Sequence, residues 1–261
     1  MDAREEATGR QQLGGDDAIT TKIGAVTLPL AVIVLVVTEY FHPSREDPMD
    51  LPAVFMEYAH SDIWTAVHLG EYFGFLLLLG GLVALYYSVS AKAGVGAGLA
   101  PFGLAAAVTA AASFTVLQAV DGVALKRAVD TWAIAPAAQK PAAFAAAEAI
   151  RWTEIAMNSF SFFLAGLTLF IFGLAIALGR VYPRWVGWIA TVSGAAFMYN
   201  GVVVVAYEGF VPSIIKLVGL LLLAVWAFIM AFLMWRNGGR RGIVRLGAAS
   251  PGAAQRPADT R

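Results

Sequence analysis

Six long apolar stretches dominate the pattern of hydrophobic and polar positions. Each is close to the roughly 20 residues that a helix needs to cross a bilayer. None shows the strict alternation of a barrel strand. The predicted spans are Ile23–Phe41, Ile63–Val89, Gly98–Val120, Ile155–Gly179, Trp185–Tyr207 and Leu217–Trp235. The pattern therefore predicts an all-α fold, a polytopic membrane protein built as a six-transmembrane-helix bundle.

Composition supports this interpretation and excludes several classes of protein. Hydrophobic residues make up 59% of the 261 residues and charged residues only 14%, against about 45–50% and about 25% in soluble domains. The formal net charge is zero, so no nucleic acid partner is expected. The chain has no cysteine, which excludes disulfides and thiolate metal sites. The lipid bilayer is the partner that the sequence implies, and nothing in it indicates an oligomeric state.

The spans define one domain, residues 23–236, between two tails. Residues 1–22 form an N-terminal tail, and residues 237–261 form a basic tail whose Ala, Gly and Pro content predicts disorder. Because basic residues favour the cytoplasmic side, we expect a plasma-membrane protein with both termini cytoplasmic and outer loops at 42–62 and 122–150. The basic residues assigned to the cytoplasmic side are Lys22, Lys92, Arg180, Arg184, Arg236, Arg240, Arg241 and Arg245.

Polar residues within and beside the spans concentrate at the outer side. Ionisable groups in a membrane are costly unless they pair with each other or line water. We therefore predict an outward-facing polar pocket. Its candidate residues are Glu39, His42, Glu57, His60, His68, Glu71, Gln118, Asp121, Arg151, Glu154, Asn158, Asn200 and Glu208.

The segment before the second span allows two arrangements. Asp50 can cap a helix that has Pro52 in its first turn. If that helix continues into the second span, five residues fall within about 80° of arc on one face. Alternatively, Ser61 and Asp62 cap a new helix at Ile63, and the segment before them lies along the membrane interface. The five residues of the stripe are Glu57, His60, Trp64, His68 and Glu71.

A second polar stripe follows the start of the fourth span at steps of three and four residues. Its members are Glu148, Arg151, Glu154, Asn158 and Ser161. The spacing favours an ion-pair ladder on Arg151 over an anion clamp. We expect the two stripes to converge, so that Glu57, His60, His68, Glu71, Asp121, Arg151, Glu154 and Asn158 share one pocket.

The histidines raise the question of a metal. Glu57 and His60 have the i, i+3 spacing of di-iron bundles, but that architecture needs a second such pair and the chain has three histidines. A single divalent metal held by His60 and His68 with Glu57 or Glu71 is a candidate; a hydrogen-bonded network is favoured over it. Haem between His42 and His68 is disfavoured, because His42 lies at the mouth of the first span and His68 more than a turn into the second.

Two classes of function compete. Ionisable residues in spans commonly mark pathways for ions and substrates, which favours a protein that binds or transports a small solute, cation or proton. A metal-dependent membrane enzyme acting on a lipid or an outer-side substrate is the alternative, and a structural or accessory role is another. No nucleophile elbow or phosphate loop is present in the sequence, so an enzyme is the less favoured class. Polar residues in the inner half are few, chiefly Ser161, Thr168 and Ser193, which favours binding or sensing over translocation.

Overall fold

The computed structural model describes residues 3–248, with side chains placed over residues 18–238. Every regular element in this part of the chain is helical. Six helices are long and apolar enough to cross a membrane: Ala18–Phe41, Trp64–Ser90, Val95–Ile134, Lys140–Ala177, Arg184–Glu208 and Ile214–Gly238. The predicted six-helix bundle is thereby confirmed, and the chain is an integral, multi-pass membrane protein.

Eleven helical elements make up these spans and their connections. Two of them, labelled η, are short π-helical segments within longer helices. The elements are α1 (Ala3–Phe41), α2 (Leu51–Ala59), α3 (Trp64–Ser90), α4 (Val95–Ala119), η1 (Val120–Leu125), α5 (Lys126–Ile134), α6 (Lys140–Ala177), α7 (Arg184–Tyr199), η2 (Asn200–Val205), α8 (Ala206–Glu208) and α9 (Ile214–Ala248).

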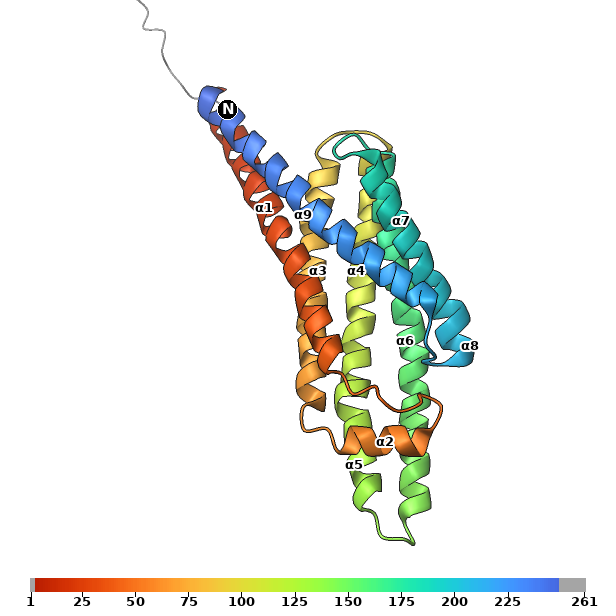
Figure 1. Cartoon of the computed structure of the whole chain (residues 1–261). Coiled ribbons are helices and arrows are strands. Elements are labelled where there is room, and N and C mark those ends of the chain that lie inside the picture. Colours follow the sequence, from red (N-terminus) through yellow and green to blue (C-terminus); the bar gives the residue numbers. More distant parts are fainter. Residues whose placement is uncertain (1–2, 249–261) are drawn as a thin grey trace, which may run out of the picture.

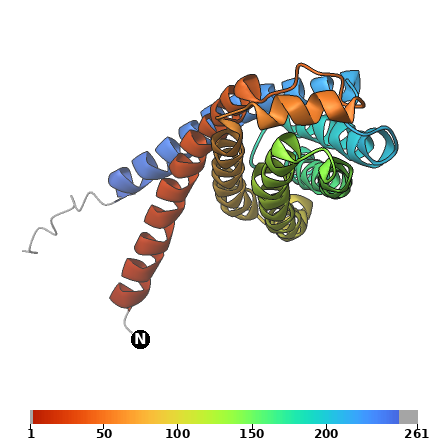
Figure 2. The same ribbon diagram turned by 90° about the horizontal axis from the view of Figure 1, so that it is seen from below.

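The spanning helices form a closed ring. Each packs against the next along the chain, in the order α1, α3, α4, α6, α7 and α9, and α9 returns to α1 (Figure 1). Seen from below, α1 and α9 diverge from the other helices toward the chain termini (Figure 2). Side chains such as Leu28, Leu85, Phe172 and Trp226 are fully buried in the core of the ring. We call the end of the bundle away from the termini the distal end.

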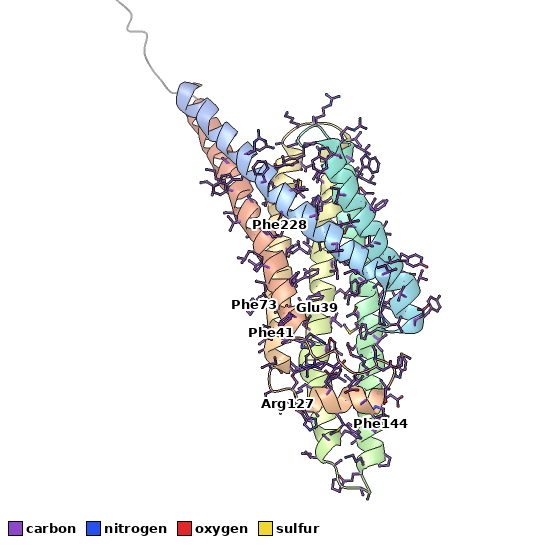
Figure 3. The ribbon with its side chains drawn as sticks, in the orientation of Figure 1. Glu39, Phe41, Phe73, Arg127, Phe144 and Phe228 are labelled. Carbon is purple, nitrogen blue, oxygen red and sulfur yellow. The ribbon has the colours of Figure 1, made fainter. Side chains whose placement is uncertain are left out.

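Large apolar side chains cover the outer surface of the ring. Phe41, Phe73 and Phe228 expose 54%, 59% and 50% of their surface (Figure 3). An apolar surface of this kind around a whole bundle is unfavourable in water and is suited to contact with lipid tails.

Helices α6 and α7 approach each other along facing glycines. A methyl group added at Gly194 would lie 2.5 Å from the carbonyl oxygen of Gly166, and one added at Gly166 would lie 2.6 Å from that of Gly194. About two turns further along α6, Gly173 faces Gly187 of α7 in the same way. Small residues that let backbones touch are the usual basis of tight helix packing in membranes.

Two helices are much longer than a bilayer needs. The continuous helix Val95–Ile134 has 40 residues and α6 has 38, or about 57–60 Å at 1.5 Å per residue, against a hydrocarbon core of about 30 Å. Residues 122–150, expected as an outer connection, are thus largely helical. Their hairpin packs with α2 around Phe55, Trp132 and Phe144, and we call this distal unit the cap.

The segment before the second span is broken into two helices. Asp50 caps α2 by accepting a 3.3 Å hydrogen bond from the backbone N–H of Ala53, as predicted. Helix α2 ends at Ala59 and α3 begins at Trp64, so the alternative of a continuous helix is wrong. The predicted caps Ser61 and Asp62 do not serve α3, whose N-cap residue is Ile63 without a side-chain hydrogen bond.

The C-terminal end also differs from expectation. Residues 237–248, expected to begin an irregular tail, continue helix α9 to Ala248. A long apolar span nucleates this helix and its last turns propagate from it. The rest of the expected tail, residues 249–261, lies outside the described residues.

Candidate functional site

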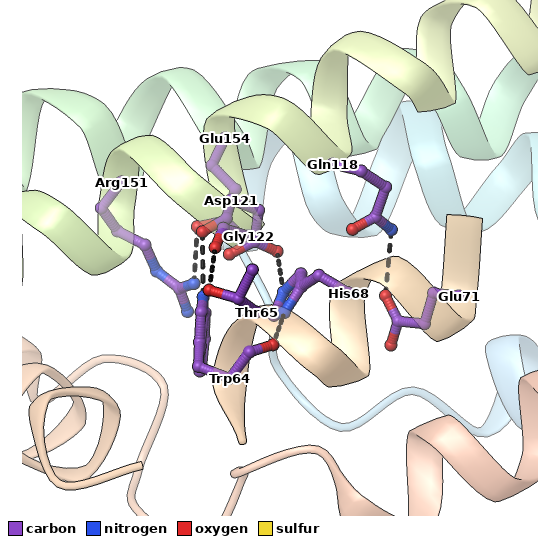
Figure 4. A network of polar contacts seen from close by, with 9 residues as sticks. All are labelled: Trp64, Thr65, His68, Glu71, Gln118, Asp121, Gly122, Arg151 and Glu154. Atoms are coloured by element: carbon purple, nitrogen blue, oxygen red, sulfur yellow. Dashed lines mark hydrogen bonds and ion pairs between the residues drawn. The ribbon is translucent and has the colours of Figure 1, made fainter. Parts of the chain in front are cut away.

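Polar side chains from four elements meet where α3, the end of α4, η1 and α6 pack together at the base of the cap (Figure 4). His68, Arg151 and Glu154 expose only 2–3% of their surface, and Asp121 exposes 8%. We call this group the polar cluster. Its members are His68, Glu71, Gln118, Asp121, Arg151 and Glu154.

A π-helical segment places Asp121 in this cluster. The change from α- to π-helical hydrogen bonding in η1 disturbs the regular pairing of backbone carbonyls. Two side chains of α3 bind carbonyls there: the indole N–H of Trp64 donates to Asp121 O at 3.0 Å, and the hydroxyl of Thr65 donates to Gly122 O at 3.1 Å. A methyl group at Gly122 would lie 2.6 Å from His68 Cβ. Glycine at this position therefore lets η1 lie directly against His68.

The orientation of His68 is fixed at both ring nitrogens. Its Nδ1 lies 2.8 Å from the carbonyl oxygen of Trp64, and because a carbonyl only accepts, Nδ1 carries the hydrogen. The other nitrogen, Nε2, lies 3.0 Å from Asp121 Oδ2. This contact is within ion-pair distance, but it is not aligned as a hydrogen bond. The Nε2 atom thus faces the carboxylate of Asp121.

Arg151 is held by a carboxylate and two aromatic rings. Its Nη1 donates to Glu154 Oε2 at 2.7 Å, and the guanidinium lies 4.7 Å from the ring centroid of Phe210 and 5.5 Å from that of Tyr58. Within the described part of the chain, Glu148 forms no ion pair with Arg151, so only half of the predicted ladder is present.

Tyr58 belongs to the wall between the cap and the polar cluster. Its ring stacks on that of Trp64 with centroids 4.0 Å apart, and the ring of Trp64 lies 4.4 Å from that of His68. Burial raises the pKa of the Tyr58 phenol above its ordinary value. The phenol is therefore neutral and adds no charge to the site.

His42 and Glu71 complete the surroundings of His68. The ring of His42 lies 5.1 Å from that of His68, so the expected difference in depth is wrong: the chain after α1 brings His42 level with His68. Glu71 accepts a 3.0 Å hydrogen bond from Gln118 Nε2. His42, His68 and Asp121 each offer one ligand atom, and these atoms lie within 4.8 Å of one another.

Several buried polar side-chain atoms of the described residues, in the cluster, on α6 and on η2, have no hydrogen-bond partner. Buried polar groups are normally paired, and each exception needs an explanation such as a bound water, an ion or a functional role. Asn200, at the start of the second π-helix, is 1% exposed. The unpaired atoms are His68 Nε2, Gln118 Oε1, Asp121 Oδ1, Arg151 Nε, Asn158 Oδ1, and both Nδ2 and Oδ1 of Asn200.

Four predicted residues lie apart from the cluster. Glu57 accepts hydrogen bonds from the backbone N–H groups of Arg45 at 3.0 Å and Glu46 at 3.3 Å, and so holds the connection after α1. His60 and Glu208 are exposed. Glu39, whose side chain is 66% exposed, lies 3.9 Å from Lys216. Among the described residues, the group able to hold a metal consists of His42, His68 and Asp121. The sequence instead suggested His60 and His68 with Glu57 or Glu71.

Sequence reasoning missed the aromatic walls and the π-helices. Trp64 stood on the predicted stripe without a role, and its spacing from His68 was the available signal. Tyr58 and Phe210 approach Arg151 from separate segments, and no local sequence pattern predicts contacts of this kind.

Fold and cluster together define a multi-pass membrane protein with a buried ionisable cluster near one end of its bundle. Comparison with known proteins found no matching family model, curated protein or solved structure.

Proposed function

We propose that the protein binds a small cation at the polar cluster from the outer side of the plasma membrane, as a binding or sensing protein. The observation that carries this proposal is the local balance of charge. Glu71, Asp121 and Glu154 bring carboxylates to the cluster, and Arg151 is its permanent cation. Buried carboxylates in excess of their partners are unfavourable unless a cation or a proton neutralises them.

The polar groups of the other half of the bundle support binding over translocation. The hydroxyl of Ser161 is paired with that of Ser113 at 2.8 Å. Thr168 and Ser193 donate to the backbone carbonyls of Leu164 and Gly219, each at 2.8 Å. Because these hydroxyls are already paired, within α6 or between helices, they offer no continuous polar route away from the cluster.

Cations are expected to stabilise the purified protein in nanodiscs against thermal unfolding. A ligand at 100 times its Kd stabilises a protein by about 2.7 kcal/mol. The unfolding midpoint would be recorded with Na⁺, K⁺, Mg²⁺, Ca²⁺, Mn²⁺ and Zn²⁺. We expect at least one of them to raise the midpoint, and Glu71→Gln or Asp121→Asn to abolish the rise. Glu208→Gln, at an exposed carboxylate outside the cluster, is the matched control and is expected to keep it. An unchanged midpoint with every cation would contradict the proposal.

The orientation of the chain is tested separately. An even number of spans places both ends on one side, and the basic residues near the termini favour the cytoplasm. A reporter active only outside the cytoplasm is expected to give no signal when fused after residue 250. The same reporter inserted after Gln139, between α5 and α6, is expected to be active. The reverse pattern would move the cluster to the cytoplasmic side.

A metal-dependent enzyme is the second candidate. The approach of His42 to His68 and Asp121 favours it, because three protein ligands leave a metal position open for substrate. The choice between binding protein and enzyme then depends on whether a transition metal binds. An accessory role would follow if no cation does.

A further inference from the structure

We propose that His42, His68 and Asp121 bind one divalent transition-metal ion at the base of the cap. This inference rests on the proposed function, since it names the class of cation and its ligands. The three residues come from three separate segments: His42 from the connection after α1, His68 from the first turns of α3, and Asp121 from η1.

The arrangement around His68 is typical of a histidine that binds a metal. Such a histidine commonly donates the hydrogen of its other ring nitrogen to a backbone carbonyl, which fixes the tautomer and the ring orientation. His68 Nδ1 makes this bond to Trp64 O at 2.8 Å. Its Nε2 lone pair is then directed at Asp121 Oδ2, 3.0 Å away. The contact needs a positive centre between the two atoms, which a metal ion bound to a neutral His68 would supply in place of a second ring proton.

Burial and unpaired atoms give independent support. His68 is 2% exposed and Asp121 is 8% exposed, yet His68 Nε2 and the second carboxylate oxygen of Asp121, Oδ1, have no hydrogen-bond partner. A protein retains such atoms at a buried position at a cost of about 1–3 kcal/mol each. Coordination of a metal would satisfy both side chains at once.

The spacing of the ligand atoms fits a small ion. With metal–ligand bonds of about 2.0–2.1 Å, ligand atoms around a tetrahedral ion lie about 3.4 Å apart. The separation of His68 Nε2 from Asp121 Oδ2 is 3.0 Å, and all three ligand atoms lie within 4.8 Å. His42 lies outside the helices and is half-buried. It is therefore the ligand whose side chain can move to reach the bonding distance of the metal.

The donor set indicates the class of metal. Two imidazoles and one carboxylate suit zinc and divalent iron or cobalt, whereas calcium and magnesium prefer oxygen ligands alone. Glu71, whose carboxyl group accepts a hydrogen bond from Gln118, is not needed as a ligand.

The proposal is tested by titrating the purified, untagged full chain with Co²⁺ after chelation, and by displacing Co²⁺ with Zn²⁺. The visible absorption of Co²⁺ reports its coordination geometry, and elemental analysis gives the stoichiometry. We expect one metal per chain and a loss of affinity of at least about tenfold in His42→Ala, His68→Ala and Asp121→Asn, since loss of an outer-shell partner alone weakens metal binding by about 10–100-fold. His60→Ala removes the exposed third histidine and is expected to bind Co²⁺ like the wild type.

His42→Ala is the deciding variant, because its half-buried side chain lies outside the helices and its loss leaves the bundle core intact. Monodisperse elution and an unchanged metal-free unfolding midpoint would verify its fold. Equal Co²⁺ affinity in His42→Ala and the wild type, or no stoichiometric metal in the wild type, would overturn the metal site. If Na⁺ or Mg²⁺ still stabilised the chain through Glu71 and Asp121, the proposed cation binding would stand without it. If no cation did, both proposals would fall.

Discussion

Replacing Arg151 by methionine is expected to lower the free energy of unfolding by about 3–5 kcal/mol, because it leaves a buried carboxylate without its partner. Arg151 and Glu154 are 3% and 2% exposed, and their contact is 2.7 Å long. The effect would be measured by equilibrium unfolding in mixed detergent micelles. We expect the double variant Arg151→Met/Glu154→Gln to recover most of the loss, since the unpaired charge is then removed.

The matched control is the ion pair of the cap. Lys126 and Asp130 are 2.5 Å apart, but the Asp130 side chain is 43% exposed. Because exposed pairs contribute about 0–1 kcal/mol, Asp130→Asn is expected to cost no more than about 1 kcal/mol. If Arg151→Met were equally mild, the interpretation of Arg151 and Glu154 as a dry, mutually dependent pair would be wrong.

Replacing Gly194 by valine is expected to be strongly destabilising although it lies outside the polar cluster. Even a single methyl group there would lie 2.5 Å from the carbonyl oxygen of Gly166, so α6 and α7 would have to separate. Overpacking typically costs about 1–3 kcal/mol, and backbone atoms as the obstacle place this substitution at the upper end of that range. We expect Gly194→Val to unfold at a markedly lower detergent or urea concentration than the wild type.

Gly80 provides the control for this substitution. It also lies within a spanning helix, but a methyl group there would meet nothing within 4 Å. Gly80→Val is expected to leave the unfolding transition within about 1 kcal/mol of the wild type, since the change is then limited to local helix propensity. A similar response of both variants would argue against close α6–α7 contact.

The sequence was sufficient for the spans because crossing a bilayer depends on length and apolar content, which are local properties. It was insufficient for the cap. The segment that forms α5 carries Lys126, Arg127 and Asp130 and is too polar for a span; its helix is stabilised by packing of Val129 and Trp132 against α2. Such stabilisation depends on a distant segment and leaves no signal in a local window.

The sequence predicted one pocket in which the polar stripes converge, but not which residues lie against one another in it. Helical spacing placed His68 with Glu71 on one helix and Arg151 with Glu154 on another. The expectation that Asp121 joins them came from its position at the outer side, and its contact with His68 depends on tertiary packing, which decides which helices are neighbours. His42 was judged too shallow, since distance along the sequence says nothing about a connection that returns over the bundle to bring two rings within 5.1 Å.

The π-helical segment η1 has a consequence for how the length of this chain can vary. Hydrogen bonds in a π-helix span one residue more than in an α-helix, and one residue corresponds to a rotation of about 100° about the helix axis. The segment therefore sets the phase of α5 relative to α4. Leu125 and Val129 face α2 in that phase, and Asp121 faces His68. A π-helical turn takes up one residue more than an α-helical turn, so a one-residue deletion within Val120–Leu125 would return the segment to regular α-helical hydrogen bonding and leave α5 close to its present phase. The deletion would then remove the disturbed carbonyls that Trp64 and Thr65 bind while the cap kept its orientation.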